Sequence, residues 1–544
     1  MGVTGTERNS VPAALVLADW ARSIDHKSIP TRVIKFAGSQ LASQIAAARA
    51  TMTLPVGKKI VRAFGLPTQD DPKSAAYVLA ALTMAADFDD TMYAGHVSHS
   101  TVSVPLAYAA TFRTDGRRLL AAIVAANECA ARITAAATLG PFRGQTAAHA
   151  HLAGSVAARM FLERAASTQW ASAWGIAFAA PPWALDHPFF GGESKALLAS
   201  TQVRAGLDAC DAAIGGIEGV MDIFEHPGGF LAKYASVPLP EMISYGLGSL
   251  WHTETLSIKI YPGCAYIDSA VDCATAIHHR LVSADHAIEP ATINEIVVES
   301  SAFTTGMDAK STPYINGPRT PLSALGFSVG YNVAVALTRG ALEISDLAPD
   351  RTDDPVVWEL ASKVHVKHDV SLTWTALQAT APLGEALKCA GSAAIPWLME
   401  MAGKIGDGTH HEMGDDTKKD VAGKMSSGGG ATENASEIAS GEKELAGTPA
   451  SSSFDPPATS FQDATKRIGA RVTVHFTDGH VEQEYRESAI GAIGPETRQS
   501  HEELARDKLL STGISLSDVS ALLQMESLGA KDIQQLLRRL LQPA

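Results

Sequence analysis

Alanine-rich segments, separated by glycine and proline breaks, dominate the chain from residue 11 to about residue 228. Four of them have the length and apolar spacing of amphipathic helices: 73–86, 116–137, 147–166 and 196–214. Alanine has the highest intrinsic helix propensity, and its small side chain lets neighbouring helices approach closely. Aromatic residues make up only 6% of the chain, so small aliphatic side chains must fill the core. The sequence therefore predicts a large all-helical domain over residues 11–250.

Alternating β-branched segments appear from about residue 250 onward and change the character of the chain. Residues 255–261 and 293–301 are predicted strands, because apolar and β-branched side chains alternate along them. Residues 267–281 and 325–339 have the spacing of helices instead. Strands interleaved with helices are typical of an α/β layer. We therefore expect a second, smaller α/β domain that begins with residues 251–400.

The segment 401–465 differs in composition, since it is rich in Gly, Ser, Ala and Thr and contains the run SSGGGA. Such a segment buries too little apolar surface to offset the entropy of ordering it. We expect a disordered insertion here; a solvated structured loop is the alternative. An alternating strand at 471–476, a Thr-Asp-Gly turn and a second strand follow, and helices are expected over 500–541. Residues 466–544 should thus complete the α/β domain, which gives an α+β fold class with an interrupted second domain.

The charge balance and the cysteine pattern restrict the class of protein. The net charge is −14, from 44 Lys and Arg against 58 Asp and Glu, and no basic run occurs, which argues against nucleic acid and anionic membranes as partners. No apolar run reaches membrane-spanning length free of charge, and no secretory signal is evident. The five scattered cysteines match neither a disulfide framework nor a CxxC metal set. We therefore expect a soluble cytoplasmic protein.

The densest cluster of polar residues lies between two apolar helical segments, over residues 87–101. Within fifteen residues it holds three carboxylates and two imidazoles: Asp87, Asp89, Asp90, His96 and His99. One interpretation is a general acid/base site, because imidazole titrates near neutral pH and a carboxylate can orient it. A second is a metal site that uses both histidines and an aspartate. A third is a helix cap and surface turn without function.

Two lysines, a cysteine and a histidine pair are further candidates. Lys195 follows a glycine break at the start of an alanine-rich helix, where it would either meet an anionic ligand or be solvated. Lys259 ends a predicted strand just before a Pro-Gly turn and is a plausible substrate clamp. Cys264 is either a nucleophile or, more often for a lone cysteine, a core residue. His149 and His151 fit a packed or surface pair better than a pair of ligands.

No GxGxxG or Walker motif occurs, so no nucleotide cofactor is expected.

Three blocks in order carry a resemblance to a known family: DFDDT with HVSHSTVSVPLAYAA, then GGESKALLASTQVRAGLDACDAAIGG, then GLGSLWHTETLSIKIYPGCAYIDSAVDCATAI. Together they resemble the MmgE/PrpD family, which includes 2-methylcitrate dehydratase, cis-aconitate decarboxylase and fungal alkylcitrate dehydratases. The similarity runs from about residue 11 to 377 and resumes near 467, and the insertion has no counterpart. The resemblance implies a helical domain with a smaller α/β lid, an active site between them, a homodimer, and no metal or other cofactor.

The resemblance also implies roles for individual positions. The family's acidic residue, threonine, catalytic histidine, two substrate-binding lysines and tyrosine match Asp87, Thr91, His99, Lys195, Lys259 and Tyr314. Gln145 stands at the family's Gly-Trp/Phe-His motif in place of the histidine, although a shifted alignment brings in His149. Cys264 stands where some decarboxylases carry a second histidine. The spacing after Thr91 leaves His96 as an alternative to His99.

These residues imply carbanion chemistry beside carboxylates. The two lysines would hold the anionic substrate, His99 would move a proton, and Asp87 or Asp90 would orient it. Thr91 and Tyr314 would bind substrate oxygens. We expect a lyase that dehydrates a 2-methylcitrate-type or 2-alkylcitrate-type tricarboxylate. The alternatives are decarboxylation of a cis-aconitate-type substrate to an itaconate-like product, and a non-catalytic binding protein derived from the family.

Overall fold

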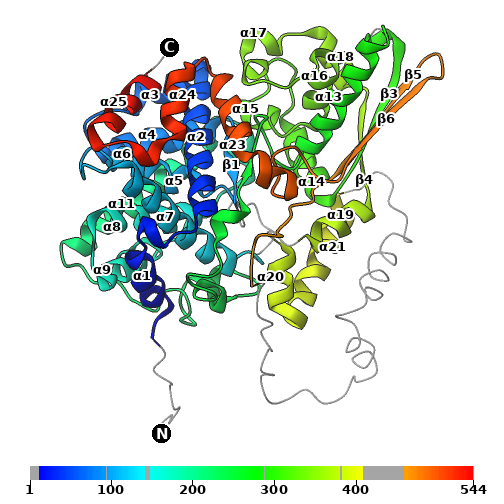
Figure 1. Ribbon diagram of the computed structural model, residues 1–544. Helices are drawn as coiled ribbons and strands as arrows, with labels where there is room; N and C mark the ends of the chain where they lie inside the picture. The colour runs from blue at the N-terminus through cyan, green and yellow to red at the C-terminus, as the bar shows by residue number, and fades with distance from the viewer. Residues whose placement is uncertain are drawn as a thin grey trace, which may run out of the picture.

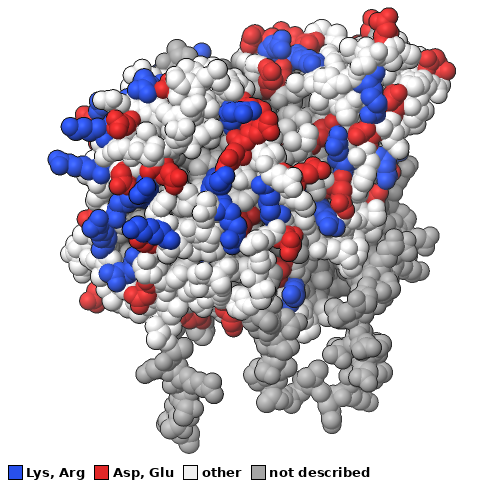
Figure 2. Space-filling model, in the orientation of Figure 1, with Lys and Arg blue, Asp and Glu red and all other residues white. Residues whose placement is uncertain are grey.

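The computed structural model describes residues 11–92, 95–140, 148–286, 288–379, 383–408 and 459–542. Two regions lie side by side, a helical domain and a smaller α/β lid (Figure 1). The expected α+β class with a large helical domain is confirmed. On the face drawn in Figure 2, acidic and basic side chains are interspersed over both regions.

The four alanine-rich segments predicted as helices are helices of the larger domain: α4 (Pro72–Ala85), α7 (Gly116–Ala136), α8 (His149–Glu163) and α11 (Leu198–Ile214). α7 begins after Asp115, whose carboxylate accepts the Arg118 N–H at 2.8 Å and so caps the helix. α7 is also long and apolar enough to cross a membrane, yet that whole stretch is buried inside the protein. It is therefore the central helix of the core.

The remaining helices of this domain surround α7 and α8. They are α1 (Ala13–Ser23), α2 (Thr31–Thr53), α3 (Pro55–Phe64), α5 (Ser98–Thr101), α6 (Ser103–Tyr108), α9 (Ser167–Ala177), α10 (Asp186–Phe190) and α12 (Phe230–Tyr234). The C-terminal helices α23 (Pro495–Leu510), α24 (Leu516–Leu523) and α25 (Ala530–Leu540) also pack here, with α23 against α2. The end of the chain thus returns from the lid to the helical core (Figure 1).

A four-stranded sheet of order β4-β3-β5-β6 forms the lid, from β3 (Ile293–Ser300), β4 (Val364–His368), β5 (Ala470–Phe476) and β6 (Val481–Arg486). β3 is parallel to β4 and antiparallel to β5, with Ile296 opposite Val474. Segments on either side of the insertion therefore share one sheet, as the two alternating patterns predicted. The helices of this region are α13 (Asp268–Ser283), α14 (Ala302–Ser311), α15 (Leu322–Leu325), α16 (Val329–Arg339), α17 (Pro349–Thr352), α18 (Pro355–Ala361) and α19 (Val370–Gln378).

The chain beside the insertion packs against the helical domain. α20 (Leu383–Ala390) and α21 (Ile395–Gly408) contribute Cys389 and Trp397 to the helical core, and the Trp397 indole donates to the Gly140 carbonyl at 2.8 Å. Residues 409–458, most of the proposed insertion, lie outside the described residues. The last residues of the proposed insertion, 459–465, are described, and Phe461 among them is buried in the helical core.

The strand expected over 255–261 is much shorter than the alternation suggested. β2 comprises only Ser257–Ile258, and it pairs with the equally short β1 (Asp90–Thr91). A 3-10 turn over His252–Thr255 precedes β2, and Pro262-Gly263 turns the chain soon after it, which together limit the pairing. This ribbon joins the aspartate-rich cluster of the helical domain to the segment that carries Lys259.

Candidate active site

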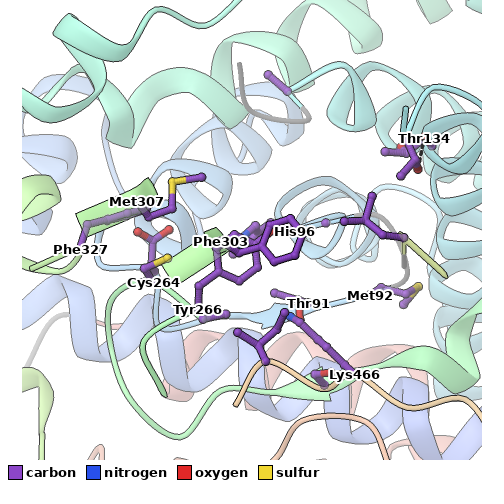
Figure 3. A pocket seen from close by; sticks show the side chains of 18 of the residues that line it. Thr91, Met92, His96, Thr134, Cys264, Tyr266, Phe303, Met307, Phe327 and Lys466 are labelled. Atoms are coloured by element: carbon purple, nitrogen blue, oxygen red, sulfur yellow. Dashed lines mark hydrogen bonds between the residues drawn. The ribbon is translucent and has the colours of Figure 1, made fainter. Parts of the chain in front are cut away.

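A cavity of about 300 Å³ lies between the helical domain and the lid. The helical domain contributes most of its polar wall: Asp87, Thr91, His96, His99, His149, His151 and Lys195. The lid side and the segment after the insertion contribute Cys264, Tyr266, Phe303, Met307, Phe327 and Lys466 (Figure 3). The helical side of the wall is therefore rich in ionisable groups, and the other side is mainly aromatic and apolar apart from Lys466 and Cys264. The size and the mixture suit a small charged ligand with a limited apolar part.

Asp89 lies fully buried behind the ionisable wall, where it contacts both of the wall's histidines His96 and His99. Its Oδ2 atom lies 2.6 Å from His96 Nδ1 and 3.3 Å from His99 Nε2, so one carboxylate oxygen serves both imidazoles. Burial raises the pKa of Asp89, but the two histidines and Lys259 outweigh it and hold that pKa well below its usual range. Asp89 is thus the fixed anion that orients the histidine pair.

The sequence analysis assigned that orienting role to Asp87 or Asp90, and the geometry assigns it to Asp89. Asp87 has φ 48°, a left-handed conformation that an aspartate tolerates, and its carboxylate forms an ion pair with Lys195. Asp90 faces away from the cavity and accepts hydrogen bonds from Gln44 Nε2, at 2.7 Å, and from Ser98 Oγ. Burial and the neighbouring Asp89 raise the pKa of Asp90 to about 7.

His99 is buried on α5, with its Nδ1 atom 2.9 Å from the Thr83 hydroxyl on α4. Burial lowers the pKa of His99 to about 4, although Asp89 opposes the change. The imidazole is therefore neutral at pH 7, and it can accept a proton. An anionic ligand in the cavity would raise this pKa and favour the proton-donating form. His96 shares Asp89 but is more exposed than His99, with 39% of its side chain accessible.

The two predicted lysines are both buried beside this cluster. Lys195, on the wall of the main cavity, pairs with Asp87 and donates to the Met84 carbonyl at 3.0 Å. Lys259 lines a small recess adjoining the main cavity, and its ammonium lies 3.6 Å from Asp89 Oδ1. Burial lowers the pKa of Lys259, but the surrounding carboxylates outweigh it and leave the pKa raised. Lys259 is therefore charged at neutral pH.

A close approach of two glycines positions Lys259. Gly263 has φ 99°, and a Cβ atom there would lie 2.4 Å from the Gly326 carbonyl oxygen. The Gly263 carbonyl, turned inward by this conformation, accepts a hydrogen bond from the Lys259 ammonium. Cys264 follows and lines the cavity, where burial raises its thiol pKa to about 12. A protonated thiol is a poor nucleophile, so the geometry favours the packing interpretation of Cys264.

Three other candidates have different outcomes. Tyr314 is not among the lining residues; its hydroxyl is 2.9 Å from His187 Nδ1, and its ring stacks behind Phe190, with centroids 6.0 Å apart. Gln145 lies outside the described residues. His149 and His151 both line the cavity, and neither ring nitrogen of His149 has a hydrogen-bond partner among the described residues.

The sequence analysis missed Lys466 and undervalued Asp89. Lys466 lines the cavity and donates to the Thr91 hydroxyl at 3.0 Å. No local motif marks this lysine, because it follows the low-complexity segment and belongs to none of the three resembling blocks.

Lys508 on α23 lies behind the aspartate cluster, where its ammonium donates to the Asp89 backbone carbonyl at 2.7 Å. The C-terminal helices thus support the backbone of the aspartate cluster.

Asp89, His96 and His99 also carry the kinds of atom that bind metal ions, and these atoms lie within 4.8 Å of one another. The Lys259 ammonium, 3.6 Å from Asp89 Oδ1, would repel a dication bound there. We therefore expect that dialysis against EDTA leaves turnover within about twofold of the untreated enzyme, a difference of about 0.4 kcal/mol in activation free energy. Loss of activity that added Zn²⁺ restores would instead support the metal interpretation.

Comparison with known proteins agrees with this arrangement of two regions. Residues 16–242 match the MmgE/PrpD N-terminal domain, and residues 261–382 match the MmgE/PrpD C-terminal domain. The chain is similar to a cis-aconitate decarboxylase of Aspergillus terreus strain NIH 2624 / FGSC A1156, with 25% identity over 387 residues, which cover 65% of this chain and 77% of that protein. A second cis-aconitate decarboxylase of Aspergillus terreus is 25% identical over 383 residues, 64% of this chain and 76% of its own length.

Proposed function

This chain belongs to the MmgE/PrpD family, and from that premise we propose that it is a lyase acting on a small polycarboxylate, by cis-aconitate-type decarboxylation. The observation that carries the proposal is the position of two buried lysines beside the Asp89–histidine cluster, Lys195 on the main cavity and Lys259 on the adjoining recess. The two decarboxylases among the relatives favour this reaction over dehydration.

The buried lysines account for the choice of an anionic substrate. A tricarboxylate carries several negative charges at neutral pH, and fixed cations in a water-poor cavity attract it more strongly than they would in water. Lys195 and Lys259 are held by backbone carbonyls as well as by carboxylates, so their ammonium groups are positioned before the substrate enters. The Thr91 hydroxyl on the same wall is placed to bind a substrate oxygen.

In the proposed reaction, the bond between the substrate carbon chain and one carboxylate breaks, and carbon dioxide leaves. The electron pair left behind shifts through the double bond to form an allylic carbanion, and the lysines stabilise the negative charge. A proton from His99 then completes the product at the other end of the allylic system. His99 requires its protonated form for this step, and the bound carboxylates and Asp89 both favour that form.

Dehydration of a 2-methylcitrate-type or 2-alkylcitrate-type substrate is the second candidate, and two observations favour it. With a pKa of about 4, His99 is neutral at pH 7, which suits removal of a proton next to a carboxylate. The apolar side of the cavity, with Phe303, Met307 and Phe327, has room for an alkyl group (Figure 3). Both reactions use the same lysines and histidine.

Direct assays separate the two reactions. We expect the purified protein to release carbon dioxide from cis-aconitate, and to form no alkene from 2-methylcitrate or from a longer 2-alkylcitrate. Carbon dioxide is measured by a coupled carboxylase assay, and alkene formation by ultraviolet absorbance. Alkene from either citrate without carbon dioxide from cis-aconitate would replace decarboxylation by dehydration. Turnover of none of the three would favour a binding protein over a lyase.

A further inference from the structure

The backbone around Lys466 is fixed to the segment that leads into α23, although it directly follows the low-complexity segment. The Lys466 N–H donates to the Ile493 carbonyl at 3.0 Å. Arg498 on α23 donates to the carbonyls of Phe461 and Ala464 at 2.8 and 2.7 Å. These bonds attach the stretch 461–466 to residues 493–498, which pack in the helical core. The lysine therefore occupies a built position rather than the tip of a loose loop.

The side chain of Lys466 points into the cavity that we assign to the substrate. It lines both the main cavity and the adjoining recess that holds Lys259. Its ammonium donates to the Thr91 hydroxyl at 3.0 Å and lies 5.9 Å from the centre of the Tyr266 ring. Lys466 and Thr91 lie next to each other along one edge of the cavity (Figure 3).

The charge of Lys466 is not neutralised by the protein, in contrast to that of Lys195. Among the described residues no carboxylate forms an ion pair with it, and its hydrogen-bond partner is a neutral hydroxyl. Burial lowers its pKa to about 8, with Asp268 opposing the change and Lys259 adding to it. A partly buried ammonium without a counter-ion is unfavourable, so an anionic ligand beside it gains a ready partner.

We propose that Lys466 binds a carboxylate of the substrate and that, with Lys195 and Lys259, it makes the site select three carboxylates over two. This inference rests on the proposed function, because it assumes a polycarboxylate ligand. The three ammonium groups come from three separate segments, one on the helical domain, one after β2 and one after the low-complexity segment. Each can therefore meet a different carboxylate of one small molecule.

Calorimetric binding of two non-reacting probes tests the inference: propane-1,2,3-tricarboxylate and propane-1,3-dicarboxylate. We expect the full-length wild type to prefer the tricarboxylate. The variant Lys466→Met should lose about 10- to 100-fold in tricarboxylate affinity, the usual range for one charged hydrogen bond, and little in dicarboxylate affinity. Lys367→Met is the matched control, because it removes the same charge from an exposed position on β4 of the lid. Its affinities should equal those of the wild type.

The outcomes distinguish this inference from the proposed function. A wild type that prefers the tricarboxylate, together with a folded Lys466→Met variant that keeps the same preference, overturns the role of Lys466 alone. A wild type that binds both probes equally overturns the selection for three carboxylates, and a wild type that binds neither removes the polycarboxylate premise and the inference with it. Removal of a desolvated charge should raise the melting temperature of the Met variant. If the Lys466→Met variant fails to fold, Lys466→Gln also removes the charge but keeps a polar side chain, and it serves the same comparison.

Discussion

Replacement of His99 by asparagine is expected to lower kcat by about 100- to 10,000-fold on whichever substrate the wild type converts, because that is the range of a general acid/base contribution. Asparagine keeps a polar group near Thr83 and Asp89 but cannot transfer the proton. His99 is fully buried and neutral at pH 7, so its loss removes no fixed charge from the fold. Steady-state kinetics, together with a melting curve, measure the effect on turnover apart from any effect on stability.

Two variants serve as comparisons for this result. His279→Asn changes an exposed histidine on α13 of the lid and should leave turnover unchanged. His96→Asn tests the other imidazole of the pair, whose Nδ1 is 2.6 Å from Asp89. Full activity of a folded His99→Asn protein would contradict the proposed site. Loss of activity in His96→Asn alone would transfer the proton-transfer role from His99 to His96.

The largest effect on stability is expected from Glu128→Ala, which should lower the free energy of unfolding by about 3–5 kcal/mol, the usual penalty for removing one partner of a buried ion pair. Glu128 lies on α7, fully buried, 3.7 Å from the Arg132 guanidinium. Its carboxylate accepts the backbone N–H groups of His252 and Thr253 at 2.9 and 2.8 Å. These residues immediately precede β2, so Glu128 also anchors the segment that delivers Lys259 to the site.

The dependence of this effect on pH has a definite sign. Burial raises the pKa of Glu128, but His252, Arg132 and the Thr253 N–H outweigh it and leave the pKa below its ordinary value of 4.5. The stabilisation is therefore complete above about pH 4.5 and is lost as the pH falls through the lowered pKa. Urea unfolding of the wild type and of Glu128→Ala should show a difference that shrinks in acid. Glu359→Ala, at an exposed position on α18, should show almost none.

The local elements follow from sequence patterns because their causes are local. Alanine content and apolar spacing determine α4, α7, α8 and α11, and alternation of β-branched residues determines β3 and β5. The predicted strand over 255–261 fails for a non-local reason. Its length depends on a partner, and that partner is the two-residue β1, more than 160 residues earlier in the chain. Alternation alone does not reveal how short a partner is.

The sequence by itself determined the residue types of the site, namely His99, Lys195 and Lys259 beside an aspartate-rich turn, together with the family to which the chain belongs. Only the tertiary structure decided which carboxylate faces the histidines, because the left-handed turn at Asp87 directs neighbouring side chains to different partners. It also decided that Lys466 reaches Thr91 across 375 residues of chain. Such contacts depend on how two domains close on each other, and no local spacing encodes that closure.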